Sequence, residues 1–430
     1  MTYENALKKI HSLLTFGSRP GLERMRLFLG ELGNPQDKLK YIHVAGTNGK
    51  GSVCALLSSV LTASDYKTGL FISPYITDFR ERIQINNQMI SRETLTEAVE
   101  RTFPVIERLR SKDIIITEFE YVNALQFLIH AESNCDIVVL ETGMGGLLDC
   151  TNVIKPPLCS VITTIGLDHT AVLGDTLEKI AEQKCGIIKS GSIAVTSSQE
   201  AAVMKVIVEN CKQKQTPLIE SNSIKINLEK SGLDGSVFIF DGIRLKLPLA
   251  GAHQLENAKT ALAALSVLKG KNLIKYSVQE LQKGFEAAVN PARLELLCDN
   301  PIVLLDGAHN PNGIQALQKA IKEFLGKKRI ICIMGMLADK DIESAISLLP
   351  DLFEKVYTVP VDNPRAIGAN ELAKMFAVHN IAATAYETPY SAFDSAYEEA
   401  KTAGSAVLIC GSLYLAGEIR PYVLKRINGT

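Results

Sequence analysis

The chain has 430 residues, enough for about two domains, because a single hydrophobic core stops growing near about 250–300 residues. With 46 basic against 47 acidic residues, its net charge of −1 argues against nucleic acid or an anionic membrane as the main partner. The nine cysteines are odd in number and never form a Cys-x-x-Cys pair, so we expect reduced thiols and no zinc or disulfide framework. No apolar run is long enough to span a bilayer. We expect a cytoplasmic, monomeric protein.

The first strong pattern follows two helices that we expect within residues 3–33. An apolar run over 41–45 predicts a buried strand, and a helix is expected over 53–61. The glycine-rich loop between them consists of Gly46, Thr47, Asn48, Gly49, Lys50, Gly51 and Ser52.

This loop is typical of a phosphate site. Its backbone N–H groups and the helix N-terminus attract anions, Lys50 can reach the outer phosphates of a nucleotide, and Ser52 can meet a magnesium ion. The spacing departs from the usual G-x-x-x-x-G-K-[ST] pattern, because Gly51 separates Lys50 from Ser52. The alternative is a plain glycine-rich turn. Phosphate binding is our working hypothesis.

Polar residues follow the next strands of the predicted sheet. Strands are expected over 67–73, 136–140 and 159–165, a hairpin over 82–90, and helices from Ser91 and over 118–132. The strand ends carry Ser73, Glu141, Asp168 and His169. Because ligands bind at the carboxyl ends of parallel strands, we expect Ser52, Ser73 and Glu141 to form a magnesium shell with the nucleotide phosphates. A structural histidine is as good an interpretation of His169 as a metal ligand.

Lys184 lies on the apolar stripe of a helix expected over 176–185. A lysine in that place either extends to water or is buried with a lowered pKa. A buried neutral amine can take up carbon dioxide and become a carbamate, which binds metal. The spacing by itself favours extension to water.

The second half of the chain alternates strands and helices. We expect a hairpin over 236–249, helices over 252–268 and 278–287, and a hinge between residues 288 and 300, where Asn290-Pro291-Ala292 breaks the pattern. Strands are then expected over 302–305, 329–334, 355–359 and 406–409. The fold class is therefore α/β, with a larger domain over 1–292 and a smaller parallel α/β domain over 293–430.

Several residues around the hinge are candidates for phosphate or ribose contact. His253 and Gln254 lie in the first turn of a helix, and Asn257 shares a face with His253. Arg293 at the hinge can clamp phosphates as the domains close, or be an ordinary exposed arginine. Asp306 and His309 follow a strand and remain candidates. Asn310 and Pro311, which come next, are explained as a helix start without a function. 

Eight motifs in the same order resemble the folylpolyglutamate synthase/dihydrofolate synthase family of the Mur ligase superfamily. They are GTNGKGS at 46–52, SPYITDFRERI at 73–83, ETGMGGLLDCTNV at 141–153, GLDHT at 166–170, EQKCGIIK at 182–189, HQLENA at 253–258, DGAHN at 306–310 and GSLYLAGE at 411–418. The resemblance covers almost the whole chain. It implies a phosphate-loop ATPase domain with a mostly parallel sheet, followed by a smaller Rossmann-like domain.

The resemblance also implies an ATP-dependent ligase that adds L-glutamate to folates, or to dihydropteroate, through an acyl phosphate. The family pattern assigns catalytic roles to Lys50, Lys184, His169 and Arg293. It places ATP on residues 46–52 and on Asn257, Arg293 and Asp306, and we keep His309 as a nucleotide contact because it follows a strand. It places Mg²⁺ on Ser52, Ser73, Glu141, His169 and a carbamylated Lys184. Substrate contacts are implied for Thr117, Phe119, Glu120 and Asp149.

The sequence departs from the family pattern at Leu147, where arginine is usual, and at Ala292, where glycine is usual. Tyr75 replaces a histidine of many bifunctional members and favours a dedicated polyglutamate synthase. The alternatives are a Mur-type ligase acting on a UDP-linked sugar peptide, and a nucleotide-driven switch that makes no covalent product. Whether the acceptor is dihydropteroate, tetrahydrofolate or both stays open.

Overall fold

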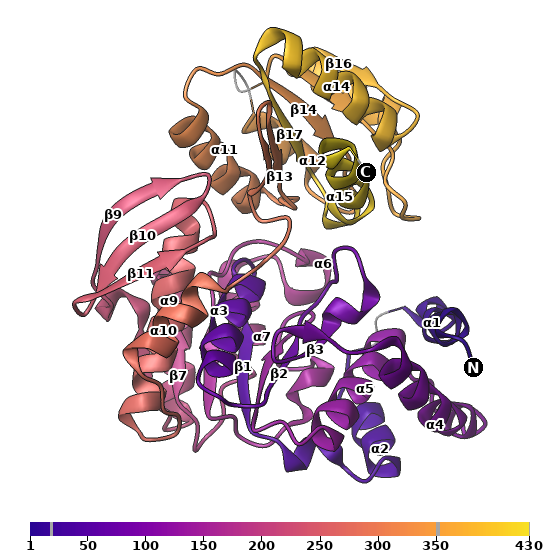
Figure 1. Ribbon diagram of the computed structural model, residues 1–430. Helices are drawn as coiled ribbons and strands as arrows, with labels where there is room; N and C mark the ends of the chain where they lie inside the picture. The colour runs from indigo at the N-terminus through magenta and orange to yellow at the C-terminus, as the bar shows by residue number, and fades with distance from the viewer. Residues whose placement is uncertain (18–19, 350–352, 430) are drawn as a thin grey trace.

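The computed structural model describes residues 1–17, 20–349 and 353–429. Three sheets organise these residues: an eight-stranded sheet in the order β4-β3-β2-β5-β1-β6-β7-β8, a three-stranded sheet β11-β10-β9, and a six-stranded sheet β12-β13-β17-β14-β15-β16. Figure 1 shows the six-stranded unit above the larger unit, with the three-stranded sheet at one side of the larger unit. Among the described residues, no helix is long and apolar enough to cross a membrane.

The strands are β1 (Tyr41–Ala45), β2 (Thr68–Phe71), β3 (Ile83–Ile85), β4 (Gln88–Met89), β5 (Ile137–Glu141), β6 (Cys159–Ile162), β7 (Ala194–Thr196), β8 (Leu218–Glu220), β9 (Ile226–Gly232), β10 (Gly235–Phe240), β11 (Ile243–Leu247), β12 (Glu295–Asp299), β13 (Ile302–Leu305), β14 (Ile330–Met334), β15 (Lys355–Thr358), β16 (Ala383–Ala385) and β17 (Ala406–Cys410). The α-helices are α1 (Tyr3–His11), α2 (Glu23–Glu31), α3 (Lys50–Ala63), α4 (Arg92–Arg110), α5 (Glu118–Glu132), α6 (Thr170–Leu173), α7 (Leu177–Cys185), α8 (Ala201–Gln213), α9 (Ala252–Gly270), α10 (Val278–Glu286), α11 (Pro311–Leu325), α12 (Ile342–Ser347), α13 (Ala369–Val378), α14 (Pro389–Ala403) and α15 (Leu413–Asn428). Short 3-10 helices span Leu14–Phe16, Pro35–Lys38, Phe79–Arg82, Cys150–Val153 and Ser221–Ser223.

Strand β1 is the centre of the large sheet. All five of its residues are buried, and it pairs in parallel with β5 on one side and β6 on the other. Helix α3 follows β1 and packs against α9 and α10, which cover one face of the sheet, while α4 and α5 pack together in the core on the other side. Because β1, β2, β5 and β6 are parallel, their carboxyl ends meet at one edge. The predicted phosphate loop and the predicted residues Ser73, Glu141 and His169 follow these strand ends.

Most predicted elements are confirmed, and the differences have local causes. Helix α3 begins at Lys50 and not at residue 53, because Gly49, with φ of +88°, ends the loop and acts as the N-cap. β16 was not predicted, because a run of three residues carries no recognisable alternation. β12 was not predicted either, because it is an antiparallel edge strand with only partly buried residues.

The connection into the six-stranded sheet is shorter than predicted, since β12 lies inside the expected hinge of residues 288–300. Ala292 and Leu294 just before it have positive φ, +55° and +46°. The backbone is held there by hydrogen bonds: Gly307 N–H donates to the Ala292 carbonyl over 2.8 Å, and Leu294 N–H donates to Asp306 Oδ2 over 2.7 Å. A left-handed backbone conformation costs about 1–2 kcal/mol at each non-glycine residue, and these hydrogen bonds offset that cost.

Candidate active site

The phosphate loop is built for close backbone approach. A Cβ on Gly46 would lie 1.8 Å from Thr163 Oγ1, and a Cβ on Gly49 would lie 2.3 Å from Asn257 Oδ1, so both positions need glycine. Lys50 opens α3, and its Nζ donates to the carbonyls of Gly46 and Thr47 over 3.1 and 3.3 Å. The Lys50 side chain thus folds over the loop, and its amine can contact an anion bound there.

A second loop, residues 163–169 after β6, supports the phosphate loop from the side. The N–H groups of Thr47 and Asn48 both donate to the Thr164 carbonyl. The Thr47 hydroxyl donates to the Gly166 carbonyl over 3.0 Å and accepts from Gly166 N–H over 3.1 Å. Any displacement of residues 163–169 therefore moves the phosphate loop.

The predicted magnesium ligands are brought to one edge. The Glu141 carboxylate accepts from Ser73 N–H over 3.2 Å and lies 3.9 Å from Lys50 Nζ. Burial raises the pKa of Glu141, and the Lys50 charge opposes that rise. The Ser52 hydroxyl accepts from Asn290 over 2.9 Å. His169 is more exposed, at 44% of its side chain, and has a left-handed φ of +51°.

This donor set suits Mg²⁺. Within the part of the chain that the structure describes, no three His, Cys, Asp or Glu side chains form a ready-made metal cage. Mg²⁺ takes few protein ligands, usually one or two carboxylates, and completes its shell with waters and nucleotide phosphates. A buried carboxylate and a serine hydroxyl beside the phosphate loop meet that requirement.

Lys184 is buried, with 4% of its surface exposed, so it does not extend to water. Its Nζ donates to the Gly46 carbonyl over 2.7 Å, which places the amine directly beneath the phosphate loop. Burial, followed by the charge of Lys50, lowers the pKa of Lys184 to about 7. A large fraction of this amine is therefore neutral at neutral pH, and a neutral amine is a nucleophile.

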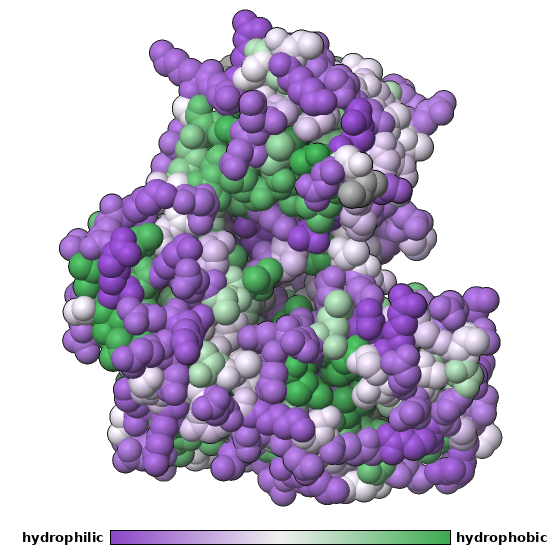
Figure 2. Space-filling model, in the orientation of Figure 1, coloured by the Kyte–Doolittle hydropathy of each residue, from purple (hydrophilic) through white to green (hydrophobic). Residues whose placement is uncertain are grey.

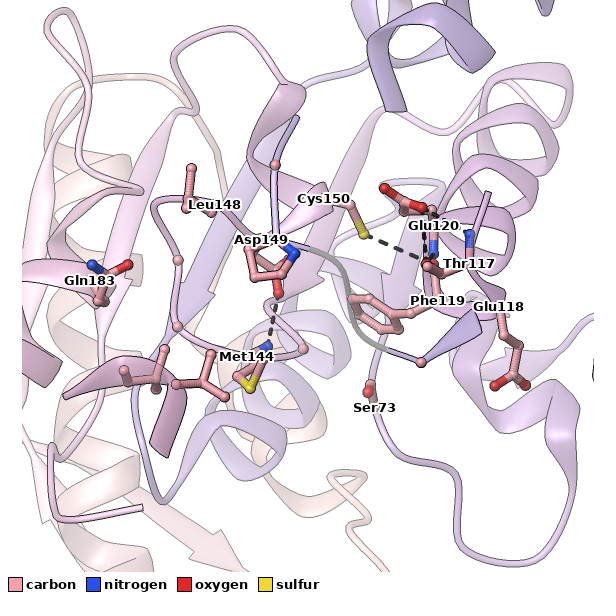
Figure 3. A pocket seen from close by; sticks show the side chains of 18 of the residues that line it. Ser73, Thr117, Glu118, Phe119, Glu120, Met144, Leu148, Asp149, Cys150 and Gln183 are labelled. Carbon is pink, nitrogen blue, oxygen red and sulfur yellow. Dashed lines mark hydrogen bonds between the residues drawn. The ribbon is translucent and has the colours of Figure 1, made fainter. Parts of the chain in front are cut away.

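A cavity of about 430 Å³ opens beside this edge, between the carboxyl ends of β2 and β5 and the start of α5. Figure 3 shows Phe119 in its middle, with Asp149 and Met144 on one side and Thr117 and Glu120 on the other. It is lined by Leu14, Gly17, Pro20, Gly21, Ser73, Thr117, Glu118, Phe119, Glu120, Gly143, Met144, Gly145, Gly146, Leu148, Asp149, Cys150, Val172, Leu173 and Gln183. The predicted substrate residues Thr117, Phe119, Glu120 and Asp149 thus share one pocket.

Two of these residues use their polar groups inside the protein. Glu120 accepts from the N–H and hydroxyl of Thr117, in a capping box at the start of α5, and from Arg24 over 2.9 Å. Asp149 accepts from Met144 N–H over 2.8 Å and from the Thr151 hydroxyl over 2.6 Å. Both carboxylates therefore shape the pocket wall. Sequence reasoning missed Arg24 and the segment around Leu14, because neither belongs to a recognisable motif.

The C-terminal candidates surround the same edge from above. Burial raises the pKa of both Glu141 and Asp306, and the charge of Arg293 opposes that rise. The Asp306 carboxylate accepts from the N–H groups of Leu294 and Ala308, each over 2.7 Å, so it fixes the turn after β13. His309 donates from Nδ1 to the Gly307 carbonyl over 2.8 Å, and burial lowers its pKa to about 4. Asn257 donates to Gln254 beside Gly49.

One charged residue at this boundary was missed. Lys340 lies in the loop after β14, within the unit built on the six-stranded sheet, which we call the C-terminal unit. Its side chain extends to Asp168, with Nζ 2.9 Å from Oδ1. Asn310 donates to Asp168 Oδ2 over 3.2 Å and to Asn48 Oδ1 over 3.4 Å. In the sequence, Lys340 stands in the charged run Asp339-Lys340-Asp341, which reads as an ordinary solvated surface.

Comparison with known proteins covers both units. Residues 44–265 match the model of the Mur ligase middle domain, and residues 292–413 match that of the Mur ligase glutamate ligase domain. The chain is 36% identical to the dihydrofolate synthase/folylpolyglutamate synthase of Bacillus subtilis, over 97% of this chain and 98% of that protein. It is 35% identical to the folylpolyglutamate synthase of Lacticaseibacillus casei, over 99% of each chain.

A solved structure with the same fold is the folylpolyglutamate synthase of Mycobacterium tuberculosis complexed with ADP and AMPPCP. It has a TM-score of 0.89 and 28% sequence identity, and the match covers 98% of this chain and 99% of that one. Both the sequence relatives and this fold span essentially the full chain. The protein therefore belongs to the folylpolyglutamate synthase/dihydrofolate synthase family of the Mur ligases.

Proposed function

We propose that this protein is an ATP-dependent amide ligase that joins L-glutamate to a folate. The proposal rests on one observation: the pocket and the phosphate loop are neighbours, joined through Ser73 and Glu141. Ser73 lines the 430 Å³ pocket, and its N–H contacts Glu141, whose carboxylate lies 3.9 Å from Lys50 of the phosphate loop. A pocket built around the Phe119 ring suits a flat heterocycle. The carboxylate of a substrate bound there can extend past Ser73 to the nucleotide phosphate.

The reaction follows from this juxtaposition. The acceptor carboxylate attacks the γ-phosphorus of ATP, the bond to the bridging oxygen breaks and ADP leaves, which gives an acyl phosphate. The glutamate amine then attacks the acyl carbon, the carbon–oxygen bond breaks, phosphate leaves and the amine loses a proton. The N–H groups at the start of α3, with Lys50 and Arg293, stabilise the transferring phosphoryl group. Asn257, Asp306 and His309 complete the nucleotide site.

Ser52, Ser73, Glu141 and His169 would hold Mg²⁺, which when bound supplies positive charge to the phosphates. We further propose that Lys184 is carbamylated: the neutral amine attacks carbon dioxide, a carbon–nitrogen bond forms and one proton is released. The buried position of the amine beside the Gly46 carbonyl and its pKa of about 7 support this step. The product is an anion that can hold a metal ion or orient its water.

The deciding experiment is glutamate-dependent phosphate release with ATP and Mg²⁺. We would offer 7,8-dihydropteroate in one assay and tetrahydrofolate in another. Release with both means a bifunctional enzyme, and release with tetrahydrofolate alone means a dedicated polyglutamate synthase. Lys50→Ala should abolish release, whereas Lys230→Ala, at an exposed ion pair with Asp234, should leave it unchanged. Absence of release with both acceptors would contradict the proposal.

The two alternatives have their own outcomes in the same series. Tight binding of UDP would favour a Mur-type substrate, and ATP turnover indifferent to folate and glutamate would favour a nucleotide switch. We propose a cytoplasmic location, which agrees with nine cysteines that are all free thiols. We also propose that the protein is a monomer. We also propose that residues 1–292 carry nucleotide and folate, and that residues 293–430 present the glutamate.

A further inference from the structure

We propose that Lys340 is a positioning residue for ligation, which holds the C-terminal unit in register with the phosphate loop through Asp168. The expected effect on ligation rests on the proposed function, whereas the contact between the two units does not. The Lys340 and Asp168 side chains are only 11% and 14% exposed, and they lie 172 residues apart in the chain. A charge pair withdrawn from water to that extent is costly unless it is well satisfied, so it does not arise as a chance surface contact.

Asp168 is well satisfied. Its Oδ1 accepts from Lys340 and from the His169 N–H over 2.9 Å each, and its Oδ2 accepts from Asn310. The carboxylate thus joins two groups of the C-terminal unit to the backbone of His169. His169 has a left-handed backbone conformation, which non-glycine residues adopt reluctantly, and this hydrogen bond to its N–H helps to hold that conformation.

The contact continues into the phosphate loop by two routes. Residues 163–169 are hydrogen-bonded to Thr47 and Asn48, and Asn310 also donates to Asn48 directly. Gly166 lies so close to the C-terminal unit that a Cβ would stand 2.0 Å from Asn312 Nδ2. The loop that would hold the nucleotide and the unit that would present the amine are therefore linked through one small group of residues.

Another close contact between the units lies at Ile76. Gly417 of α15 packs on the Ile76 carbonyl, where a Cβ would stand 1.8 Å away, and Ile76 packs on the apolar core of the C-terminal unit. Without Lys340, the C-terminal unit keeps this contact and the Asn310 hydrogen bonds to Asp168 and Asn48, but it loses the ion pair. It can then tilt about Ile76, which opens the site to water at the stage of the acyl phosphate.

The test compares Lys340→Met, which keeps the length of the side chain and removes its charge, with Lys340→Arg, which keeps the charge. The control is Lys355→Met, because Lys355 pairs with Glu399 within the C-terminal unit and away from the boundary. We expect Lys340→Met to lower amide formation at least about tenfold and to raise the phosphate released per amide formed, because breaking one partner leaves a buried charge unpaired. Lys340→Arg should restore most of the coupling, and Lys355→Met should match the wild type.

A second measurement does not depend on activity. Small-angle scattering of the nucleotide-free proteins should give a larger radius of gyration for Lys340→Met than for Lys355→Met. If the wild type showed no glutamate-dependent release, the proposed function would fail, yet scattering would still decide the contact. Asp168→Asn should reproduce the scattering change, and the double variant should be no more open than either single one.

Two outcomes would overturn the inference. One is a Lys340→Met protein that matches Lys355→Met both in phosphate released per amide and in scattering. The other is a raised KM for glutamate with an unchanged radius of gyration, because that result would make Lys340 a direct substrate ligand.

Discussion

Replacing Lys184 by methionine should make the protein more stable at neutral pH while it abolishes ligation. In the folded protein the pKa of Lys184 is about 7, against 10.5 for an ordinary lysine, because the amine is buried. At ~1.4 kcal/mol for each pH unit, burying this amine costs ~4 kcal/mol at pH 7. The variant also loses the hydrogen bond to the Gly46 carbonyl, worth ~1 kcal/mol. The net gain expected from Lys184→Met is therefore ~3 kcal/mol.

The pH dependence has a definite sign. Between pH 7 and 10.5 the unfolded chain keeps the Lys184 proton that the folded protein releases, so the stability of the wild type rises with pH in this window. The methionine variant has no such slope. Its advantage should therefore shrink from ~3 kcal/mol at pH 7 to ~1 kcal/mol at pH 9.

The assay is urea unfolding at both pH values, followed by far-ultraviolet circular dichroism because the chain has no tryptophan. Buffers are freed of carbon dioxide so that no carbamate forms. Lys179→Met on the same helix is the matched control: the Lys179 side chain is 60% exposed, and the variant should differ from the wild type by less than about 1 kcal/mol at either pH. A Lys184→Met advantage that is absent at pH 7, or equal at both pH values, would refute the reasoning.

Further predictions concern single positions. Gly49→Ala places a Cβ 2.3 Å from Asn257 Oδ1 at a φ of +88°, so ADP affinity measured by calorimetry should fall at least about tenfold. Gly143→Ala places a Cβ 2.3 Å from the Phe119 ring, so steady-state kinetics should show a raised KM for the folate and an unchanged KM for ATP. Burial lowers the pKa of His43 to about 3. Because the unfolded chain takes up that proton first, stability is lost as the pH falls below about 6.5, by ~2 kcal/mol at pH 5. His43→Gln should flatten the urea midpoint between pH 7 and 5.

Each of these has an outcome against it. Gly270→Ala is the control for both glycine variants, because Gly270 has ordinary backbone and open space around it, and it should leave ADP affinity and both KM values unchanged. If Gly49→Ala or Gly143→Ala behaved like this control, the steric argument would be wrong. For His43, a variant whose urea midpoint falls with acid as steeply as the wild type would show that other groups carry the dependence.

The sequence was informative where one stretch carries its own signal. The apolar run of β1, the glycines after it and the start of α3 are adjacent, so their order alone predicts the phosphate loop. The same holds for the helix that begins after Ser91. Lys184 is a partial success: its place on an apolar stripe predicted either burial or extension to water, and only packing against the Gly46 carbonyl distinguishes them.

The sequence was silent where function depends on a distant partner. Lys340 stands in a run of charges and differs in no local feature from lysines on the surface. It becomes notable only because Asp168 lies 2.9 Å from its amine across the boundary between units. Arg24 was missed for the same reason, since its partner Glu120 is 96 residues away.

Glu120 shows why residue type and position do not by themselves define a role. It lies in the pocket, as the family resemblance implies, yet one carboxylate oxygen accepts from Thr117 and the other from Arg24. A carboxylate with both oxygens occupied in a buried site has little capacity left for a ligand. Its physical effect is to fix the first turn of α5, and that turn carries Phe119 into the middle of the pocket. The heterocycle recognition that we propose for Phe119 therefore depends on the Arg24–Glu120 ion pair, which the ligand need not touch.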